Sequence, residues 1–295
     1  MSVTQQVITL FLIALIGAFC RHIRIFSDET IHGLTGFVVS ITLPFLCYEA
    51  LQRPFSKEIL EGFLLTMGLT FVILILSLAA AWRLFARRPR ERRAVIANLC
   101  AFSNCGFMGY PIIMAINPDL MIYAAAYNVS FSLLCWSYGV YLFSNEPSFN
   151  PWRIIKNPAI IACVIGFIAF CTGFTLPTVL DSVISTIGNL TTPLTMLLIG
   201  TRIYGIQLSE LRDKDYHLVA LLRLIIIPLI VYLMRFLPIS SDIATVLFVL
   251  TAMPCGTVVS MLAEIYNGDI LFSARSVAWT TLLSVATIPV MCMLL

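Results

Sequence analysis

Long apolar runs alternate with short polar connections along the whole chain. A helix that crosses a bilayer needs about 20 mostly apolar residues, and the chain has room for ten such helices. The predicted spans cover residues 6–20, 30–51, 59–82, 94–116, 120–143, 158–174, 176–200, 216–234, 243–265 and 270–294. The pattern therefore predicts an all-α integral membrane protein with ten transmembrane helices.

Two of the ten spans carry helix-breaking residues at their centres. In the fourth span, Gly106 and Pro111 follow the polar side chain of Asn104 within the sequence NCGFMGYP. In the ninth span, Pro254 and Gly256 interrupt an apolar run. Irregular backbone at membrane depth is tolerated only where protein or a wet cavity surrounds it. We therefore expect both spans to be broken helices inside a bundle.

The positions of the prolines suggest an internal repeat. Pro44 in the second span matches Pro193 in the seventh with a shift of 149 residues, and Pro111 matches Pro254 with a shift of 143. Because five spans per half is an odd number, the second half enters the membrane from the opposite side, as in inverted-repeat transporters. The predicted organisation is a five-helix repeat at residues 1–144, a short linker at 145–157 and an inverted five-helix repeat at 158–295.

Composition agrees with the apolar pattern. The chain is 60% hydrophobic and 11% charged, and its mean hydropathy is +0.97. Soluble domains carry about 25% charged residues, so little of this chain is left for one. The nine cysteines lie in or beside apolar runs, which indicates reduced packing residues, and the three histidines are scattered. We predict no cofactor, no metal site and no nucleic-acid partner.

The charges set the expected orientation. Fourteen of the eighteen Lys and Arg residues lie in connections on one side of the ten-span arrangement, among them the run RRPRERR, and three lie on the other side. Since positive charge is retained in the cytoplasm, both termini are expected on the non-cytoplasmic side of the membrane. The remaining basic residue, Arg223, lies inside the eighth span. We interpret it as a snorkelling or paired side chain rather than a substrate contact.

The broken spans can form an anion site. If each helix restarts at its proline, its N-terminal end carries unpaired N–H donors and about half a positive charge near the membrane midplane. Such ends bind anions without Lys or Arg, and the Asn104 amide could add a further donor. We expect the backbone donors around Ile112 and Ile113 and around Cys255 and Gly256. The alternative is a pair of ordinary proline kinks in packed helices.

The candidate substrate-binding residues are those at the two breaks, together with Asn128, a polar side chain in the fifth span. They are Asn104, Gly106, Tyr110, Pro111, Ile112, Asn128, Met253, Pro254, Cys255 and Gly256. No catalytic residue is predicted, because the spans hold no HExxH sequence and no facing pair of carboxylates. No phosphate-binding loop is present either, so gradients or a partner would have to drive any transport.

Over nearly its whole length the chain resembles the auxin efflux carrier family. The resemblance rests on NCGFMGYP at residues 104–111 and on AMPCGTVVSMLAEIYNGD at residues 252–269, with weaker echoes around Pro44 and Pro193. The family includes plant auxin exporters and bacterial carriers proposed for malonate and other organic acids. The long loop between the halves of the plant exporters is replaced here by the short linker, so a small organic acid is the better expectation than auxin.

The resemblance implies the fold shared with bile acid symporters, in which helices four and nine cross at their prolines. It places the family's substrate-binding Asn on Asn104 and the crossover prolines on Pro111 and Pro254. It also implies a scaffold of spans one, two, six and seven, often the homodimer contact, and a transport domain of spans three to five and eight to ten.

The expected function is secondary transport of small organic anions, such as mono- or dicarboxylates, across the plasma membrane by alternating access, with the transport domain moving against the scaffold. One alternative is a sodium-coupled carrier resembling bile acid symporters, which would need carbonyls and polar side chains near the breaks as a sodium site. Another is a membrane ligand sensor that binds at the crossover without transport. An intramembrane enzyme is a further class, disfavoured by the missing catalytic constellation.

Overall fold

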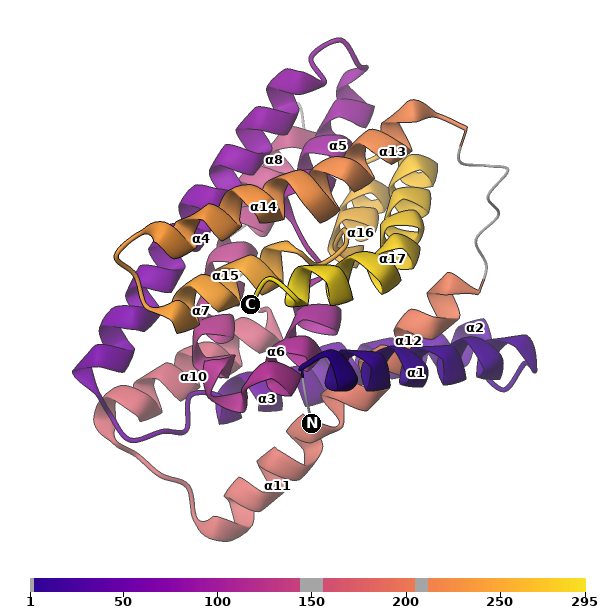
Figure 1. Cartoon of the computed structure of the whole chain (residues 1–295). Coiled ribbons are helices and arrows are strands. Elements are labelled where there is room, and N and C mark those ends of the chain that lie inside the picture. The colour runs from indigo at the N-terminus through magenta and orange to yellow at the C-terminus, as the bar shows by residue number, and fades with distance from the viewer. Residues whose placement is uncertain (1–2, 144–155, 205–211) are drawn as a thin grey trace. The chain divides into compact units, whose positions relative to one another are not determined.

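The computed structural model describes residues 3–143, 156–204 and 212–295, and these residues are almost entirely helical (Figure 1). Within these ranges the only extended pairing is an isolated antiparallel bridge between Ser103 and Cys255. The all-α prediction is therefore confirmed for the described part of the chain. Residues 145–155 of the predicted linker lie outside the described residues.

Apolar helices cover most of the predicted spans. Within the described residues, six are long and apolar enough to cross a membrane: Asp28–Glu49, Lys57–Leu84, Pro118–Phe143, Thr178–Thr201, Lys214–Phe236 and Ile270–Cys292. Shorter apolar helices are Ile8–His22, Cys105–Ile116, Pro158–Thr172 and Ser241–Thr251. These lengths agree with a multi-pass membrane protein.

The chain forms two compact units, which are described separately. Unit 1 comprises residues 1–67, 106–129 and 152–204, and unit 2 comprises residues 68–105, 130–151 and 205–295. The predicted third, fourth and fifth spans are divided between the units, whereas each other span belongs to one unit.

Unit 1 holds the N-terminal helices and the helices that follow the linker. Its elements are α1 (Val3–His22), α2 (Asp28–Phe37), η1 (Val38–Thr42), α3 (Leu43–Glu49), the start of α4 (Lys57–Leu84), α6 (Tyr110–Ile116), η3 (Pro118–Leu120), most of α7 (Met121–Leu134), α10 (Pro158–Thr172), α11 (Thr178–Asn189) and α12 (Thr191–Ile203).

Glycines allow two helices of unit 1 to pack closely. A Cβ on Gly17 of α1 would lie 2.1 Å from the Leu197 carbonyl oxygen, and a Cβ on Gly200 of α12 would lie 1.8 Å from the Ala14 carbonyl oxygen. Small residues at such contacts are typical of helix pairs in membranes, where van der Waals packing replaces the hydrophobic effect.

Unit 2 holds the first half of the fourth span and most of the C-terminal part of the chain. Its elements are the rest of α4, α5 (Arg90–Ala101), the first residue of η2 (Cys105–Gly109), the end of α7, η4 (Cys135–Gly139), α8 (Val140–Phe143), α13 (Lys214–Leu221), η6 (Leu222–Ile226), α14 (Ile227–Tyr232), η7 (Leu233–Phe236), α15 (Ser241–Thr251), α16 (Thr257–Ile265) and α17 (Ile270–Cys292).

In the part of the chain that the structure describes, three spans contain a π turn that ends two residues before a proline. The turns η1, η2 and η6 precede Pro44, Pro111 and Pro228, each the second residue of the α-helix that follows. A proline ring clashes with the carbonyl group four residues earlier, and its missing N–H leaves that carbonyl without a partner. The wider π turn lies at that carbonyl in all three cases, so the helix continues through the proline.

The helix of the fourth span restarts earlier than the sequence suggested. We expected the restart at Pro111, but the helical segment begins at Cys105, because η2 joins α6 without a break. Ile112 and Ile113 therefore lie in the second turn or later, and their amides are not the first donors of the helix. In the ninth span the restart is also displaced, from Pro254 to Thr257.

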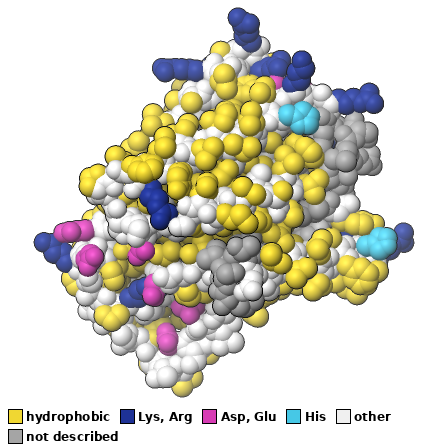
Figure 2. All heavy atoms as spheres, in the orientation of Figure 1, with side chains coloured by type: hydrophobic (Ala, Val, Ile, Leu, Met, Phe, Trp, Pro, Cys, Tyr) yellow, Lys and Arg dark blue, Asp and Glu magenta, His cyan; other side chains and the backbone are white. Residues whose placement is uncertain are grey.

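The surface is mainly apolar. Figure 2 shows hydrophobic side chains over most of the visible face and few charged ones. Large apolar side chains are exposed along α1 and α4, for example Leu15, Phe19 and Leu76. Exposed apolar surface on this scale is typical of helices that face lipid.

Charged residues at the ends of three unit 2 helices form a network. Arg92 pairs with Asp213, with Asp215 at 3.1 Å and with Asp269 at 3.7 Å, and Arg88 pairs with Asp215 at 2.7 Å. Burial alone would raise the pKa of Asp213, but the Asp215 amide and Arg92 lower it. Charge-assisted hydrogen bonds tie the ends of α5 and α13 together, and the longer ion pair between Arg92 and Asp269 adds the end of α17.

Candidate functional site

Both broken spans pass through unit 2, and their interruptions pair with each other. Residues 102–104 and 254–256, which we call the crossover, run antiparallel as extended backbone. The Asn104 amide donates to the Pro254 carbonyl at 2.8 Å, and the Gly256 amide donates to the Phe102 carbonyl at 2.8 Å. Backbone groups that would be unsatisfied in lipid are thus satisfied by the other broken helix.

Gly256 is required by the close approach of the two segments. A Cβ at this position would lie 2.9 Å from the carbonyl oxygens of Phe102 and Ser103, and both contacts are backbone atoms. Its backbone angles, φ −70° and ψ 134°, suit any residue. Gly256 is therefore needed for the space it leaves and not for its conformational freedom.

The Cys255 amide has a partner on a third helix. It donates to Thr280 Oγ1 at 3.2 Å, and this hydroxyl in turn donates to the carbonyl oxygens of Ser276 and Val277 in α17. The predicted donors at Cys255 and Gly256 are therefore both used within the protein. The amides at the start of α16, from Thr257, are the next donors of this helix end.

Asn104 has a buried side chain that makes no hydrogen bond to another described residue. The residue is 5% exposed, and its backbone amide donates to the Pro254 carbonyl. A buried amide without a partner costs free energy unless a water or a ligand satisfies it. Because Asn104 also lies at the crossover, it is a candidate for direct contact with a bound molecule.

Arg223 binds the backbone carbonyl groups at the two helix ends that lead into the crossover. It is fully buried, and its guanidinium donates from Nε to the Met253 carbonyl at 3.0 Å and from Nη2 to the Thr251 carbonyl at 2.7 Å. Nη1 donates to the carbonyls of Cys100 at 2.9 Å and Ala101 at 3.3 Å. One side chain therefore caps the C-terminal ends of both α5 and α15, where helices leave carbonyl groups without partners.

The sequence indicated that Arg223 either snorkels or is paired, and the structure shows a buried, paired side chain. Its partners could not be found from the sequence. They lie 28 to 123 residues away along the chain. The available signal was a basic residue within an apolar span, which in membrane proteins usually marks a functional or structural site. Thr280 was missed because hydroxyl side chains are common in membrane helices.

The remaining predicted site residues lie in unit 1. Tyr110 is fully buried, and its hydroxyl donates to the Ala124 carbonyl at 3.4 Å and accepts a contact from Cys47 Sγ at 3.8 Å. Ile112 is also buried. These contacts are typical of packing. Gly106, where a Cβ would meet only the Leu43 side chain at 3.7 Å, does not need to be glycine for space.

Asn128 in α7 is the second amide of the predicted set. It is 9% exposed and, like Asn104, makes no side-chain hydrogen bond to another described residue. Pro111 in α6 is buried as well. Asn104, Met253, Pro254, Cys255 and Gly256 are thus gathered in unit 2, while the other five candidates belong to unit 1.

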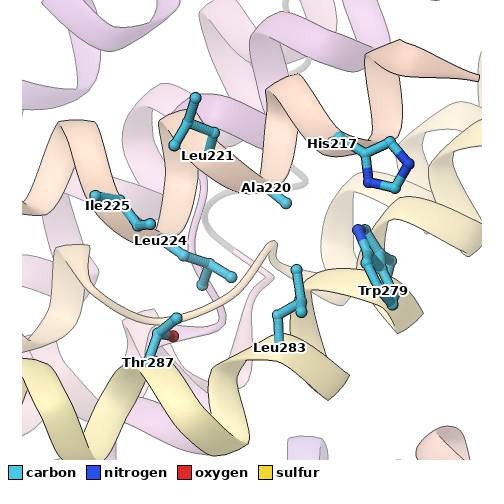
Figure 3. A pocket seen from close by; sticks show the side chains of 8 residues that line it. All are labelled: His217, Ala220, Leu221, Leu224, Ile225, Trp279, Leu283 and Thr287. Carbon is cyan, nitrogen blue, oxygen red and sulfur yellow. The ribbon is translucent and has the colours of Figure 1, made fainter.

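A separate groove of about 260 Å³ lies between α13, η6 and α17 in unit 2 (Figure 3). His217 and Trp279 meet edge to face at one end, with ring centroids 5.7 Å apart, and Thr287 lies at the other end. Most of its lining is apolar, and it contains none of the predicted site residues. An apolar wall offers little stabilisation to a carboxylate, so we do not place the anion site there.

The fold and the crossover define a multi-pass membrane protein of the transporter class. The sequence profile of the family described as membrane transport protein matches the chain twice, at residues 2–148 and 146–292. The chain belongs to this family, which is of the auxin efflux carrier type and is a family of transporters rather than enzymes. No curated protein matches the chain.

Proposed function

We propose that the protein is a secondary transporter of small organic anions, such as mono- or dicarboxylates, that binds its substrate at the crossover and works by alternating access. Membership of the family supports a transport function. The geometry of the crossover supports this part of the fold as the substrate-binding site. The observation that carries the substrate class is the Asn104 side chain, which is 5% exposed and makes no hydrogen bond to another described residue, beside the N-terminal end of α16. An amide donor and a helix N-terminus together favour a carboxylate.

Several features support ten spans in two inverted repeats. The six long and four shorter apolar helices each coincide with one predicted span. The family profile matches once in each half of the chain, and each half contains one broken helix. A location in the plasma membrane with both termini outside, a scaffold of spans one, two, six and seven, and a homodimer through that scaffold remain predictions.

The test is a binding screen on the purified protein. Mono- and dicarboxylates that bind the folded state raise its apparent melting temperature with the logarithm of their concentration above the dissociation constant. We expect at least one dicarboxylate to do so for the wild type. Asn104→Ala should remove that shift while leaving the melting temperature without ligand close to the wild-type value.

Asn189→Ala is the matched control, because Asn189 is an exposed residue of α11 whose side-chain amide donates to Ser185. It should keep the full ligand-induced shift. An equal shift in Asn104→Ala would contradict the assigned site, and no shift with any organic acid would contradict the substrate class. Uptake of the same acid into proteoliposomes separates a transporter from a sensor, since a sensor binds without flux.

A further inference from the structure

The carbonyl groups behind the crossover form a strongly negative environment. The C-terminal end of a helix carries about half a negative charge, and α5 and α15 both end there, so together they amount to about one negative charge. In the membrane interior such carbonyls need a hydrogen-bond donor or a cation as a partner, and a positive charge also balances the helix dipoles. Two partners are chemically suitable: a small metal cation such as sodium, or a cationic side chain.

Arg223 supplies that charge. Its guanidinium is fully buried and donates to carbonyl oxygens of Cys100, Thr251 and Met253, with a fourth bond to Ala101. It reaches both helix ends at once, and the guanidinium group of an arginine is a cation with five N–H donors. The π turn η6 contains Arg223 and belongs to the same span as Pro228, so the wider turn that accommodates the proline also positions this side chain.

We infer that Arg223 is a built-in counter-cation of the crossover, so that this protein holds its crossover together without an alkali cation. The carbonyl oxygens that could coordinate sodium are engaged by the guanidinium. The positive charge is therefore permanent and does not arrive with the substrate. The N-terminal end of α16 keeps its own partial positive charge for an anion.

One consequence rests on the proposed transport function. If no cation travels with the organic anion, each transport cycle moves net negative charge, and flux responds to the membrane potential rather than to a sodium gradient. The structural part of the inference does not depend on that function, because it concerns the folded protein without substrate.

The test therefore uses cations as probes and needs no substrate. For the wild type, the apparent melting temperature in sodium chloride should equal that in choline chloride at the same ionic strength. Arg223→Ala should melt at a markedly lower temperature, because the carbonyls of two helix ends lose their partner. Sodium or methylguanidinium, but not choline, should then restore part of the loss, since a small cation can return to the oxygens.

Arg235→Ala is the matched control, because Arg235 is an exposed arginine of η7 whose guanidinium donates to the Leu295 carbonyl. It should melt like the wild type and should not respond to these cations. Arg223→Lys keeps the charge with fewer donors, so it should melt between the wild type and Arg223→Ala and remain insensitive to sodium. If Arg223→Ala does not fold, the wild type and Arg223→Lys decide the question.

A rise in the wild-type melting temperature with sodium would overturn the inference, and so would an Arg223→Ala protein that is as stable as the wild type. A destabilised Arg223→Ala protein that neither cation restores would also overturn it, since Arg223 would then be a packing residue. These outcomes differ from failure of the proposed function, which would appear as missing organic-acid binding with the cation results unchanged.

Discussion

Replacing Gly256 with alanine would push a methyl group into the crossover. The new Cβ would lie 2.9 Å from the carbonyl oxygens of Phe102 and Ser103, closer than carbon and oxygen normally approach. Neither oxygen can rotate away, because both belong to the backbone. The two extended segments must therefore separate, which would weaken the bonds from Gly256 to Phe102 and from Asn104 to Pro254.

The size of the effect follows from two contributions. Overpacking a well-packed interior costs about 1–3 kcal/mol. A buried backbone group left without its hydrogen bond costs about 1–3 kcal/mol more. No backbone strain is added, because the angles of Gly256 suit alanine. The free energy of unfolding should therefore fall by about 2–6 kcal/mol, which at about 2–4 °C per kcal/mol lowers the melting temperature on the order of 10 °C.

Thermal unfolding in detergent, followed by intrinsic fluorescence, measures this loss. Gly68→Ala is the control, because Gly68 lies in α4 and a Cβ there would meet nothing within 4 Å. Alanine is a better helix former than glycine by about 0.5–1 kcal/mol, so this variant should be as stable as the wild type or slightly more so. If Gly256→Ala melted at the wild-type temperature, the close approach of the segments would be refuted.

Three further predictions concern other parts of the chain. Gly200→Val should lower the melting temperature, because even a Cβ there would lie 1.8 Å from the Ala14 carbonyl oxygen. Gly33→Ala is the control and should not lower it, because a Cβ at Gly33 would meet nothing within 4 Å. The lowered pKa of Asp213 means that its charge stabilises the fold above the ordinary Asp pKa and that this stabilisation is lost as pH falls through the lowered value. The wild type should thus exceed Asp213→Asn in melting temperature by a constant amount between about pH 5 and 8 and lose this advantage in stronger acid. The C-terminus is predicted on the non-cytoplasmic side, so an alkaline phosphatase fused after Leu295 should be active in a bacterial host and a fluorescent protein fused there should be dark. The opposite pair of results would place the C-terminus on the cytoplasmic side.

Much of the fold could be predicted from the apolar pattern because membrane helices must satisfy their own backbone groups. The spans and both interruptions follow from where apolar residues, Gly106, Pro111 and Pro254 stand in the chain. The restart of the fourth span could not be predicted, because Pro111 suits the start of a helix as well as the turn after a π segment. Hydrogen bonding, rather than residue type, separates these two structures.

The candidate site could be predicted only in part. Asn104 and Gly256 stand out in the sequence as polar or small residues in apolar runs, and both lie at the crossover. The use of the Cys255 amide by Thr280 depends on a helix distant in sequence, as do the four carbonyl partners of Arg223. A single sequence shows that such residues must find partners but does not say which.

The central claim is that the two broken helices meet as paired antiparallel segments, and a disulfide can measure it directly. Ser103 and Cys255 face each other between the two crossover hydrogen bonds, in the arrangement where Cα atoms lie about 4.5 Å apart, which is within the range that a disulfide bridges. Ser103→Cys should therefore form a disulfide with the native Cys255 on treatment with a membrane-permeant oxidant. Mass spectrometry of the digested protein would identify it.

Ser77→Cys is the control, because Ser77 is a buried serine of α4 that bonds within its own helix and should give no link to Cys255. The account predicts a 103–255 disulfide in the first variant and none in the second. A Ser103→Cys protein that is folded, oxidised and still free of that link would contradict the crossover.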